Sequence, residues 1–368
     1  MVSTAFGIVL LRSIIRYPGV EANAYILPSF TISYGCLLIF FILTRLPYSR
    51  ALLFISFVVT IIWFIVVHAL ARRRRVMTIG IVPGGDYQTL QAVAGVNWIV
   101  LTDATQNLDG LQAVAADLRV DIAPEWDRAL ADCALAGIPV YHTKHLAESL
   151  TGMVELEHLS ENSFGTLAPV SAFMTFKHIL DWMIAAVVGL VLAPLMILLA
   201  IFIRLDSPGP AIFRQMRIGY RGKPFTVYKF RTMVSSPKSV PALDAAKTQT
   251  EDKRITRIGS FLRRSRIDEL PQILNILRAE MSWIGPRPEA QVLSQWYEGE
   301  IPFYRYRHIV RPGLTGWAQV HQGHVAEVED VKTKLNYDFY YIKTYSPWID
   351  LLIVAKTTQT ILNGFGAK

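Results

Sequence analysis

The chain has 368 residues, of which 52% are hydrophobic and 18% charged, and its net charge is +8. This length suits two or three domains, and the apolar balance indicates a membrane-associated protein. A basic chain suits nucleic acid, an anionic membrane surface or phosphorylated substrates. We find no RNA- or DNA-binding motif, so nucleic acid is not expected as a partner. The two cysteines, Cys36 and Cys133, cannot form a disulfide framework or a cysteine metal motif, which fits a reducing compartment.

Two apolar segments, about 24–44 and 51–70, are long enough to cross a bilayer as helices. The arginines at 72–75 follow the second segment, and the positive-inside rule places them in the cytoplasm. Two crossings then return the N-terminus to the same side. The preceding segment, 6–15, is too short and too charged to span, so we expect it at the membrane interface. It lacks the cleavage site of a signal peptide.

A third apolar segment, about 179–204, has basic residues on both flanks and Pro194 inside it. Positive charge on both sides argues against a simple crossing. Proline removes a backbone hydrogen bond and kinks a helix. We therefore expect a re-entrant helix–break–helix with its hinge at Pro194. A third transmembrane helix with a tolerated proline is the alternative.

Residues 76–167 are predicted to form a small Rossmann-like α/β module. Its glycines and Asp103 only loosely resemble a dinucleotide fingerprint, and the G-x-G-x-x-G spacing is absent. We therefore favour a structural or regulatory role over nucleotide binding. The expected strands lie at 76–82, 98–101 and 138–142, and the expected helices at 90–94 and 125–136.

Two adjacent carboxylates, Asp268 and Glu269, precede Pro271. Proline suits the first helical position, so the pair is expected at the N-terminus of a helix over 271–278. The positive end of the helix dipole favours ionised carboxylates and attracts phosphate. Taken alone, the dipeptide is better explained as a cap on a solvated surface. The neighbouring cations favour phosphoryl chemistry instead; they are Arg263, Arg264, Arg266 and Arg287.

The alternating pattern at 228–233 is typical of a half-buried strand, with Lys229 and Arg231 on one face. Such a pair suits either a solvated edge or contact with lipid headgroups or a diphosphate. Other expected elements are a loop at 235–251, a turn with Arg311 at 311–317, a helix at 337–342 and an amphipathic helix at 348–362.

Seven motifs occur together in one order in the second half of the chain. They are Lys177 with Asp181, Ser-Pro-Gly-Pro at 207–210, Arg214-Gln215, Tyr-Lys-Phe-Arg-Thr-Met at 228–233, Asp-Glu-Leu-Pro-Gln at 268–272, Gly-Pro-Arg-Pro at 285–288 and Pro-Gly-Leu-Thr-Gly at 312–316. Each motif is weak alone, but their ordered set is specific. The segment 177–366 resembles the bacterial sugar transferase family, the monotopic polyprenol-phosphate phosphoglycosyl transferases.

The resemblance implies a reaction. A nucleotide diphospho-sugar, by family analogy a UDP-sugar, donates its sugar phosphate to a membrane polyprenol (undecaprenyl) phosphate, and UMP leaves. The family's aspartate is the nucleophile, which assigns Asp268 to a covalent phosphosugar intermediate and Glu269 to its support. Mg²⁺ would bind at both carboxylates. The residues expected to hold phosphate oxygens are Arg263, Arg287, Lys229, Arg231 and Arg311.

The family also has a re-entrant helix kinked at a Ser-Pro pair, which corresponds here to Ala193-Pro194. Its longer members place transmembrane helices and a Rossmann-like module before the catalytic domain. The resemblance therefore implies a membrane α/β protein: transmembrane helices in 1–75, the module in 76–167, and a monotopic, α-rich α+β catalytic domain in 168–368. Four transmembrane helices are commoner than the two expected here, so the start is either a short variant or truncated.

The same resemblance implies the bacterial inner membrane, a catalytic domain that faces the cytoplasm, and the first membrane step of exopolysaccharide, capsule or O-antigen synthesis. The sugar, the role of the module and the oligomeric state, a homodimer included, stay open.

Two other functions are weighed against this one. A non-catalytic membrane scaffold or regulator of polysaccharide assembly would not require Asp268 and Glu269 with their arginines. A multi-spanning glycosyltransferase would release a nucleoside diphosphate. An assay for UMP release separates both from the leading function.

Overall fold

The computed structural model describes residues 2–14, 22–72, 77–104, 110–155, 171–234, 254–322 and 328–363. It divides into two compact units, Met1–Met153 and Val154–Lys368. Three predicted features lie outside the described residues: the domain limits near 75 and 167, the arginines at 73–75, and the loop at 235–251.

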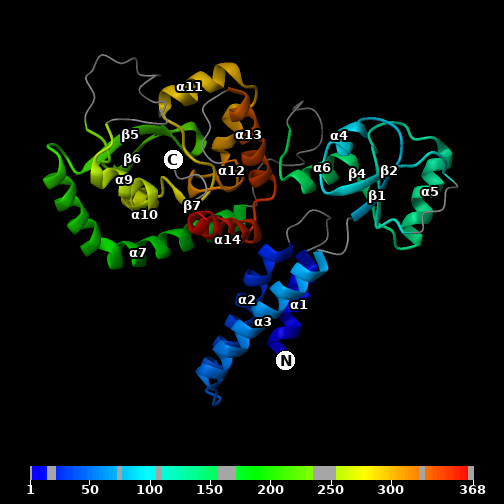
Figure 1. Ribbon diagram of the computed structural model, residues 1–368, viewed down its shortest axis with the longest axis horizontal. Coiled ribbons are helices and arrows are strands. Elements are labelled where there is room, and N and C mark those ends of the chain that lie inside the picture. The colour runs from blue at the N-terminus through cyan, green and yellow to red at the C-terminus, as the bar shows by residue number, and fades with distance from the viewer. Residues whose placement is uncertain are drawn as a thin grey trace. The chain divides into compact units, whose positions relative to one another are not determined.

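Three apolar helices open the first unit (Figure 1): α1 (Val2–Ile14), α2 (Ala22–Thr44) and α3 (Arg50–Arg72). The last two confirm the predicted helices, and both meet the length and composition of a membrane span. Polar side chains join them, because the Tyr34 hydroxyl lies 2.9 Å from Ser56 Oγ and 3.0 Å from Thr60 Oγ1. Such hydrogen bonds link helices where the surroundings are apolar.

The rest of the first unit confirms the predicted α/β character of this region. Its parallel sheet has the order β2-β1-β3-β4. The strands are β1 (Met77–Ile81), β2 (Val96–Val100), β3 (Ala113–Ala116) and β4 (Val140–His142). The helices are α4 (Gln88–Gln91), α5 (Pro124–Leu135) and α6 (Thr143–Thr151). Strand β3 and helix α6 were not predicted from the sequence.

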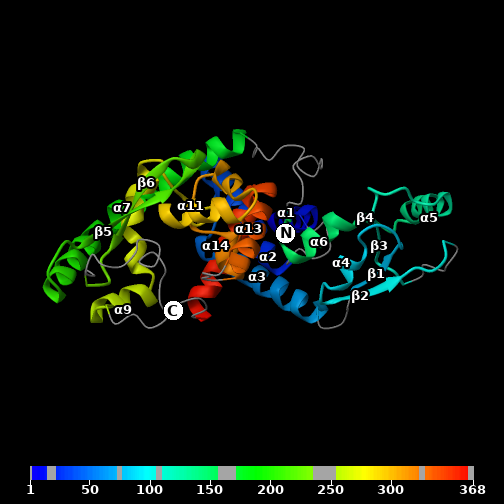
Figure 2. The same cartoon turned by 90° about the horizontal axis from the view of Figure 1, so that it is seen from above.

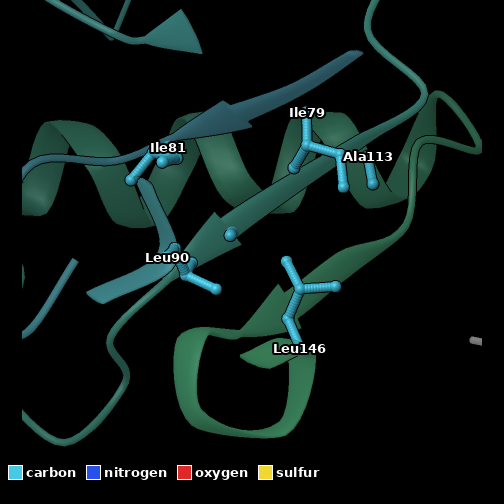
Figure 3. Packing of buried hydrophobic residues seen from close by; sticks show 6 residues of the cluster. Ile79, Ile81, Leu90, Ala113 and Leu146 are labelled. Carbon is cyan, nitrogen blue, oxygen red and sulfur yellow. The ribbon is translucent and has the colours of Figure 1, made fainter. Parts of the chain in front are cut away.

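One face of this sheet packs against α4 and α6 (Figure 3). Side chains of Ile79 and Ile81 from β1 meet Leu90 from α4 and Leu146 from α6, and all four are fully buried. Ala113 of β3 completes the cluster. Burial of this apolar surface stabilises the module independently of any ligand.

The second unit begins with α7 (Ser171–Asp206), a helix of 36 residues. Pro194 lies inside this continuous helix, so the helix is not divided in two at the proline, whereas re-entry into the membrane stays a prediction. Proline removes one backbone hydrogen bond from the helix. The leucines, alanines and methionine around Pro194 are strong helix formers, which favours a helix that continues on both sides of it. The helix follows a curved course along the unit (Figures 1 and 2).

Both halves of α7 pack on the same part of the second unit. Ala185 lies in a core cluster with Val227 and Ile273, and Ile203 lies in another with Phe230 and Leu262. The strands β5 (Ile212–Ile218) and β6 (Pro224–Phe230) form an antiparallel hairpin, and β6 contributes Val227 to the first cluster and Phe230 to the second. The strand predicted at 228–233 therefore begins earlier and ends at Phe230.

The remaining elements complete the second unit. They are η2 (Tyr220–Gly222), α9 (Arg257–Arg264), η3 (Ile267–Gln272), α10 (Ile273–Leu277), β7 (Ser282–Ile284), α11 (Gln291–Glu300), η4 (Tyr304–Ile309), β8 (Gly313–Thr315), α12 (Trp317–His321), α13 (Val328–Lys343) and α14 (Pro347–Asn363). Helices α13 and α14 confirm those predicted at 337–342 and 348–362. Strands β7 and β8 pair in parallel.

Candidate active site

The Asp268–Glu269 pair lies in the short 3-10 helix η3, which also contains Pro271. The α-helix α10 begins only at Ile273, so the prediction that Pro271 opens it is wrong. The φ that proline imposes also suits a 3-10 turn, which allows proline inside η3. Asp268 and Glu269 expose only 9% and 7% of their surface. These values exclude a cap on a solvated surface.

Glu269 is bonded to two cations from distant parts of the chain. Lys229 Nζ donates to Glu269 Oε1 at 2.8 Å. Arg287 Nη2 donates to the same oxygen at 2.7 Å, and Arg287 Nη1 lies 3.5 Å from Oε2. Burial opposes ionisation of Glu269, but the charges of Arg287 and Lys229 outweigh it and hold its pKa well below the ordinary value. Glu269 is therefore a fixed anion between two cations.

Asp268 has the opposite environment. Its Oδ1 is buried and has no hydrogen-bond partner among the described residues. Burial, followed by the neighbouring Glu269 charge, raises the pKa of Asp268 above its ordinary value. A carboxylate with a raised pKa and an unused oxygen is a stronger nucleophile than one held in an ion pair.

Asn275 fixes the distance between η3 and the strand that carries Lys229. Its side chain is fully buried. Asn275 Nδ2 donates to the Thr226 carbonyl at 2.7 Å, and Asn275 Oδ1 accepts from the Tyr228 amide at 3.3 Å. These two bonds join the turn after η3 to β6 on the N-terminal side of Lys229.

Three other predicted phosphate ligands make different contacts. Arg231 Nη2 donates to Ser207 Oγ at 2.9 Å and to the Ile203 carbonyl at 3.2 Å, at the C-terminal end of α7. Arg263 Nε donates to Thr232 Oγ1 at 3.0 Å. Arg231 and Lys229 therefore do not share a target, because β6 has ended before Arg231.

Arg311 lies in a separate polar region. Its guanidinium carbon is 5.9 Å from the centre of the Tyr220 ring. Burial lowers the pKa of Arg311, and the nearby tyrosines and Asp181 oppose this shift. Of the five predicted phosphate ligands, Lys229 and Arg287 are the ones that contact the carboxylate pair among the described residues.

A further group of charged residues in this region was not predicted from the sequence to belong to the site. It comprises Arg217, Glu289, Arg307, Lys334 and Asp338. Asp338 is 1% exposed and pairs with Arg307 at 2.7 Å. A usable signal existed in the sequence, since an acidic residue on the apolar face of an expected helix requires a buried partner.

The carboxylate pair fits a magnesium site only in part. Mg²⁺ usually binds one or two carboxylates together with substrate phosphates. No cluster of three potential metal ligands occurs within the described part of the chain. Asp268 Oδ1 fits as one ligand because it is buried and unpartnered. Glu269 does not fit, because Lys229 and Arg287 occupy its carboxylate.

Comparison with known proteins shows which family the chain belongs to. A family model described as "Bacterial sugar transferase" matches residues 172–364. The chain is 46% identical over 363 residues to UDP-N-acetylgalactosamine-undecaprenyl-phosphate N-acetylgalactosaminephosphotransferase of Aeromonas hydrophila, which covers 98% of this chain and 85% of that protein.

Shorter matches include two UDP-glucose:undecaprenyl-phosphate glucose-1-phosphate transferases. The Caulobacter vibrioides protein is 45% identical over 188 residues, which are 50% of this chain and 69% of that protein. The Escherichia coli protein is 40% identical over 196 residues, which are 52% of this chain and 40% of that protein. The chain thus belongs to the bacterial sugar transferase family.

Proposed function

We propose that this protein transfers a sugar phosphate from a UDP-sugar to undecaprenyl phosphate and releases UMP. One observation carries the proposal: Asp268 has a buried oxygen without a partner, whereas Glu269 beside it binds two cations. A carboxylate that has one unpartnered oxygen and lies next to a cationic cluster suits attack on a diphosphate. The relatives named above act on UDP-sugars and undecaprenyl phosphate by their names, which supports the same chemistry.

The proposed reaction has two displacements at one phosphorus atom. Asp268 forms a bond to the sugar-linked phosphorus, and the bond from that phosphorus to the UMP oxygen breaks. UMP leaves with the electron pair, and the sugar phosphate stays on Asp268 as an acyl phosphate. An oxygen of undecaprenyl phosphate then attacks the same phosphorus, and Asp268 leaves as a carboxylate. A soluble donor and a lipid acceptor thus use one site in turn.

Lys229 and Arg287 act on the diphosphate while Glu269 holds them in place. Lysine has three N–H donors and arginine has five, so the carboxylate of Glu269 cannot use them all. Their remaining donors can bind phosphate oxygens and stabilise the charge of the transition state. Mg²⁺ would be held by one oxygen of the Asp268 carboxylate and by substrate oxygens, which leaves the other carboxylate oxygen for attack, and would further neutralise the diphosphate.

The test of this function uses the full chain in membranes or nanodiscs with radiolabelled UDP-sugar. Asp268→Asn is expected to abolish transfer and the labelled protein adduct. Its matched control is Asp206→Asn, which changes a carboxylate at the end of α7. Transfer by Asp268→Asn near the wild-type rate would exclude Asp268 as nucleophile. Release of UDP in place of UMP would exclude the reaction class, and activity in EDTA would exclude the metal.

The donor sugar is also a proposal. The A. hydrophila relative matches almost the whole chain, whereas the glucose-1-phosphate transferases match about half of it. UDP-N-acetylgalactosamine is therefore the first donor to test. In a panel with UDP-glucose, UDP-galactose and UDP-N-acetylglucosamine, it is expected to give the highest kcat/KM for UMP release. A higher value for UDP-glucose would reject this choice.

We also propose that α7 enters the membrane and returns to the same side. Near its start, Lys177 Nζ lies 2.6 Å from Asp350 Oδ2, and Asp181 accepts from Ser282 Oγ at 2.5 Å. At its end, Ser207 accepts from Arg231. Both ends of α7 are thus bonded to the same unit. A straight helix of 36 residues would be about 54 Å long, which is enough to cross the membrane. A crossing would carry one end through about 30 Å of hydrocarbon.

Between these polar ends, α7 exposes a row of apolar side chains. Val187, Leu190 and Val191 expose 64%, 79% and 70% of their surface. Thr175→Cys and Lys223→Cys, each in a background without Cys36 and Cys133, place one label on each side of the apolar stretch. Re-entry predicts that an impermeant reagent added from the cytoplasmic side labels both. Labelling from opposite sides would reject re-entry.

A further inference from the structure

We propose that Arg217 and Arg307 are positioning residues for Arg287. They bind the carbonyls of Arg287 and Pro288, and so fix the guanidinium that pairs with Glu269. The inference rests on the proposed function, in which Arg287 lies in the active site. Among the described contacts, neither Arg217 nor Arg307 touches the carboxylate pair, so both are proposed to act through Arg287.

The loop that carries Arg287 cannot hold itself in place. Pro286 and Pro288 have no N–H, so the loop lacks donors for regular secondary structure. Its anchors come from elsewhere: Gly285 N donates to the Thr315 carbonyl at 2.9 Å, and Gly313 N donates to the Pro286 carbonyl at 3.0 Å. These bonds hold the start of the loop on β8. The carbonyls of Arg287 and Pro288 need separate donors.

Arg307 on η4 binds the first of these carbonyls. Its Nη2 donates to the Arg287 carbonyl at 2.9 Å and to Asp338 Oδ2 at 2.7 Å, and its Nη1 donates to the Tyr304 hydroxyl at 2.8 Å. Arg307 is 3% exposed. The planar guanidinium reaches all three acceptors at once, which a lysine cannot do with the same geometry.

Arg217 on β5 binds the second carbonyl. Its Nη1 donates to the Pro288 carbonyl. Its Nε and Nη2 both donate to Gln215 Oε1, at 3.2 and 2.9 Å. The Gln215 amide therefore orients the guanidinium toward the loop. Two arginines from two separate elements thus hold two consecutive peptide carbonyls.

Charge balance makes this arrangement possible in a buried place. Asp338 pairs with Arg307, and the charges of Lys334, Arg307 and Arg217 hold the pKa of Glu289 below its ordinary value although burial opposes this. Buried ion pairs commonly add less stability than apolar side chains of the same volume. Such a network is therefore better explained by a need for geometry than by a need for stability. The group whose position must be fixed is the Arg287 guanidinium.

A double-mutant cycle tests whether Arg307 acts through Arg287. In the wild-type background, Arg307→Lys is expected to lower kcat about ten- to a hundredfold, the cost of a misplacement near 1 Å, with KM changed less than about threefold. In the Arg287→Met background, the same substitution is expected to cause no further loss. Arg217→Lys should behave in the same way. Arg305→Lys, an exposed neighbour on η4, is the matched control and should leave kcat unchanged.

Each outcome has one meaning. If Arg307→Lys lowers the measured rate by the same factor with and without Arg287, the substitution acts independently of Arg287, as a loss of folded enzyme would. That result would overturn the inference. If Arg307→Lys and Arg217→Lys both keep the wild-type kcat, the inference is also wrong. If Arg287→Met alone keeps full activity, the proposed function of Arg287 fails first, and that result is distinguishable because it needs no second substitution. Thermal midpoints of all variants give the folded fraction.

Discussion

Lys229 Nζ lies 2.8 Å from Glu269 Oε1, although 40 residues separate the two in the chain. The ion pair joins the strand β6 to the 3-10 helix η3, and Asn275 on α10, the helix that follows η3, is bonded to β6 beside it. Burial lowers the pKa of Lys229 to about 8 and outweighs the opposing effect of Glu269. The charge at this position therefore changes within the range of an ordinary activity assay.

We expect activity to fall as the pH rises through about 8, because Lys229 then loses its proton and Glu269 keeps one cation fewer. Lys229→Arg should remove this alkaline limb, since arginine stays charged well above that pH. Its kcat below the limb is expected to be lower, because the guanidinium has a different shape. Initial rates of UMP release between pH 6 and 10, on the order of eight points, would measure this.

Lys223→Arg is the control for this experiment, since Lys223 is exposed at the other end of the same hairpin. It should keep the wild-type profile. An alkaline limb that persists unchanged in Lys229→Arg would show that another group causes it.

Substitutions of the two carboxylates are expected to have different effects on stability. Asp268 is a buried anion with an unpartnered oxygen, so Asp268→Asn should leave the thermal midpoint unchanged or raise it. Glu269→Gln leaves Lys229 and Arg287 buried without their counter-charge, which costs about 3–5 kcal/mol. Both variants are expected to lose most of their transfer activity.

Differential scanning fluorimetry at pH 7.5 would compare both variants with wild type. Glu280→Gln serves as a reference, because Glu280 is less buried and accepts a bond from Asn275. A midpoint that falls in Asp268→Asn as far as in Glu269→Gln would contradict the assigned environments.

Much of this site followed from the sequence because its key residues lie in short motifs whose ordered set resembles the bacterial sugar transferase family. Asp268, Glu269, Lys229 and Arg287 were all named from local motifs, and the structure brings them together. Their roles were less accessible. Only the three-dimensional arrangement shows that Glu269 is paired and that Asp268 retains an unpartnered oxygen.

The errors have physical causes. Strand β3 was missed because Ala-Val-Ala-Ala has little intrinsic preference for a strand, and its place in the middle of the sheet comes from tertiary packing. Arg231 was grouped with Lys229 because a two-residue alternation was extended past the end of β6. Asp338 on its expected helix signalled a buried partner, but no local pattern identifies that partner as Arg307, which lies 31 residues away in the chain.

A last prediction concerns the stability of the second unit in acid. His308 on η4 is 7% exposed. Burial, followed by the charges of Arg307 and Arg305, lowers its pKa to about 3 against the opposing effect of Glu289. In the unfolded chain the His308 imidazole has the ordinary pKa of about 6.5. Between about pH 6.5 and 3, His308 is therefore protonated in the unfolded state and neutral in the folded state. His308 therefore destabilises the fold progressively as the pH falls through this window, and has no such effect above it.

His308→Gln is expected to weaken the loss of thermal midpoint between pH 7 and pH 4.5, because glutamine does not titrate. His145→Gln, in the exposed part of the first unit, is the control and should leave the slope for the second unit unchanged. Tryptophan fluorescence of the full chain in nanodiscs, recorded at several pH values, measures the difference. A wild-type slope retained by His308→Gln would mean that other groups cause the acid sensitivity, and that the neutral imidazole beside Arg307 does not contribute to it.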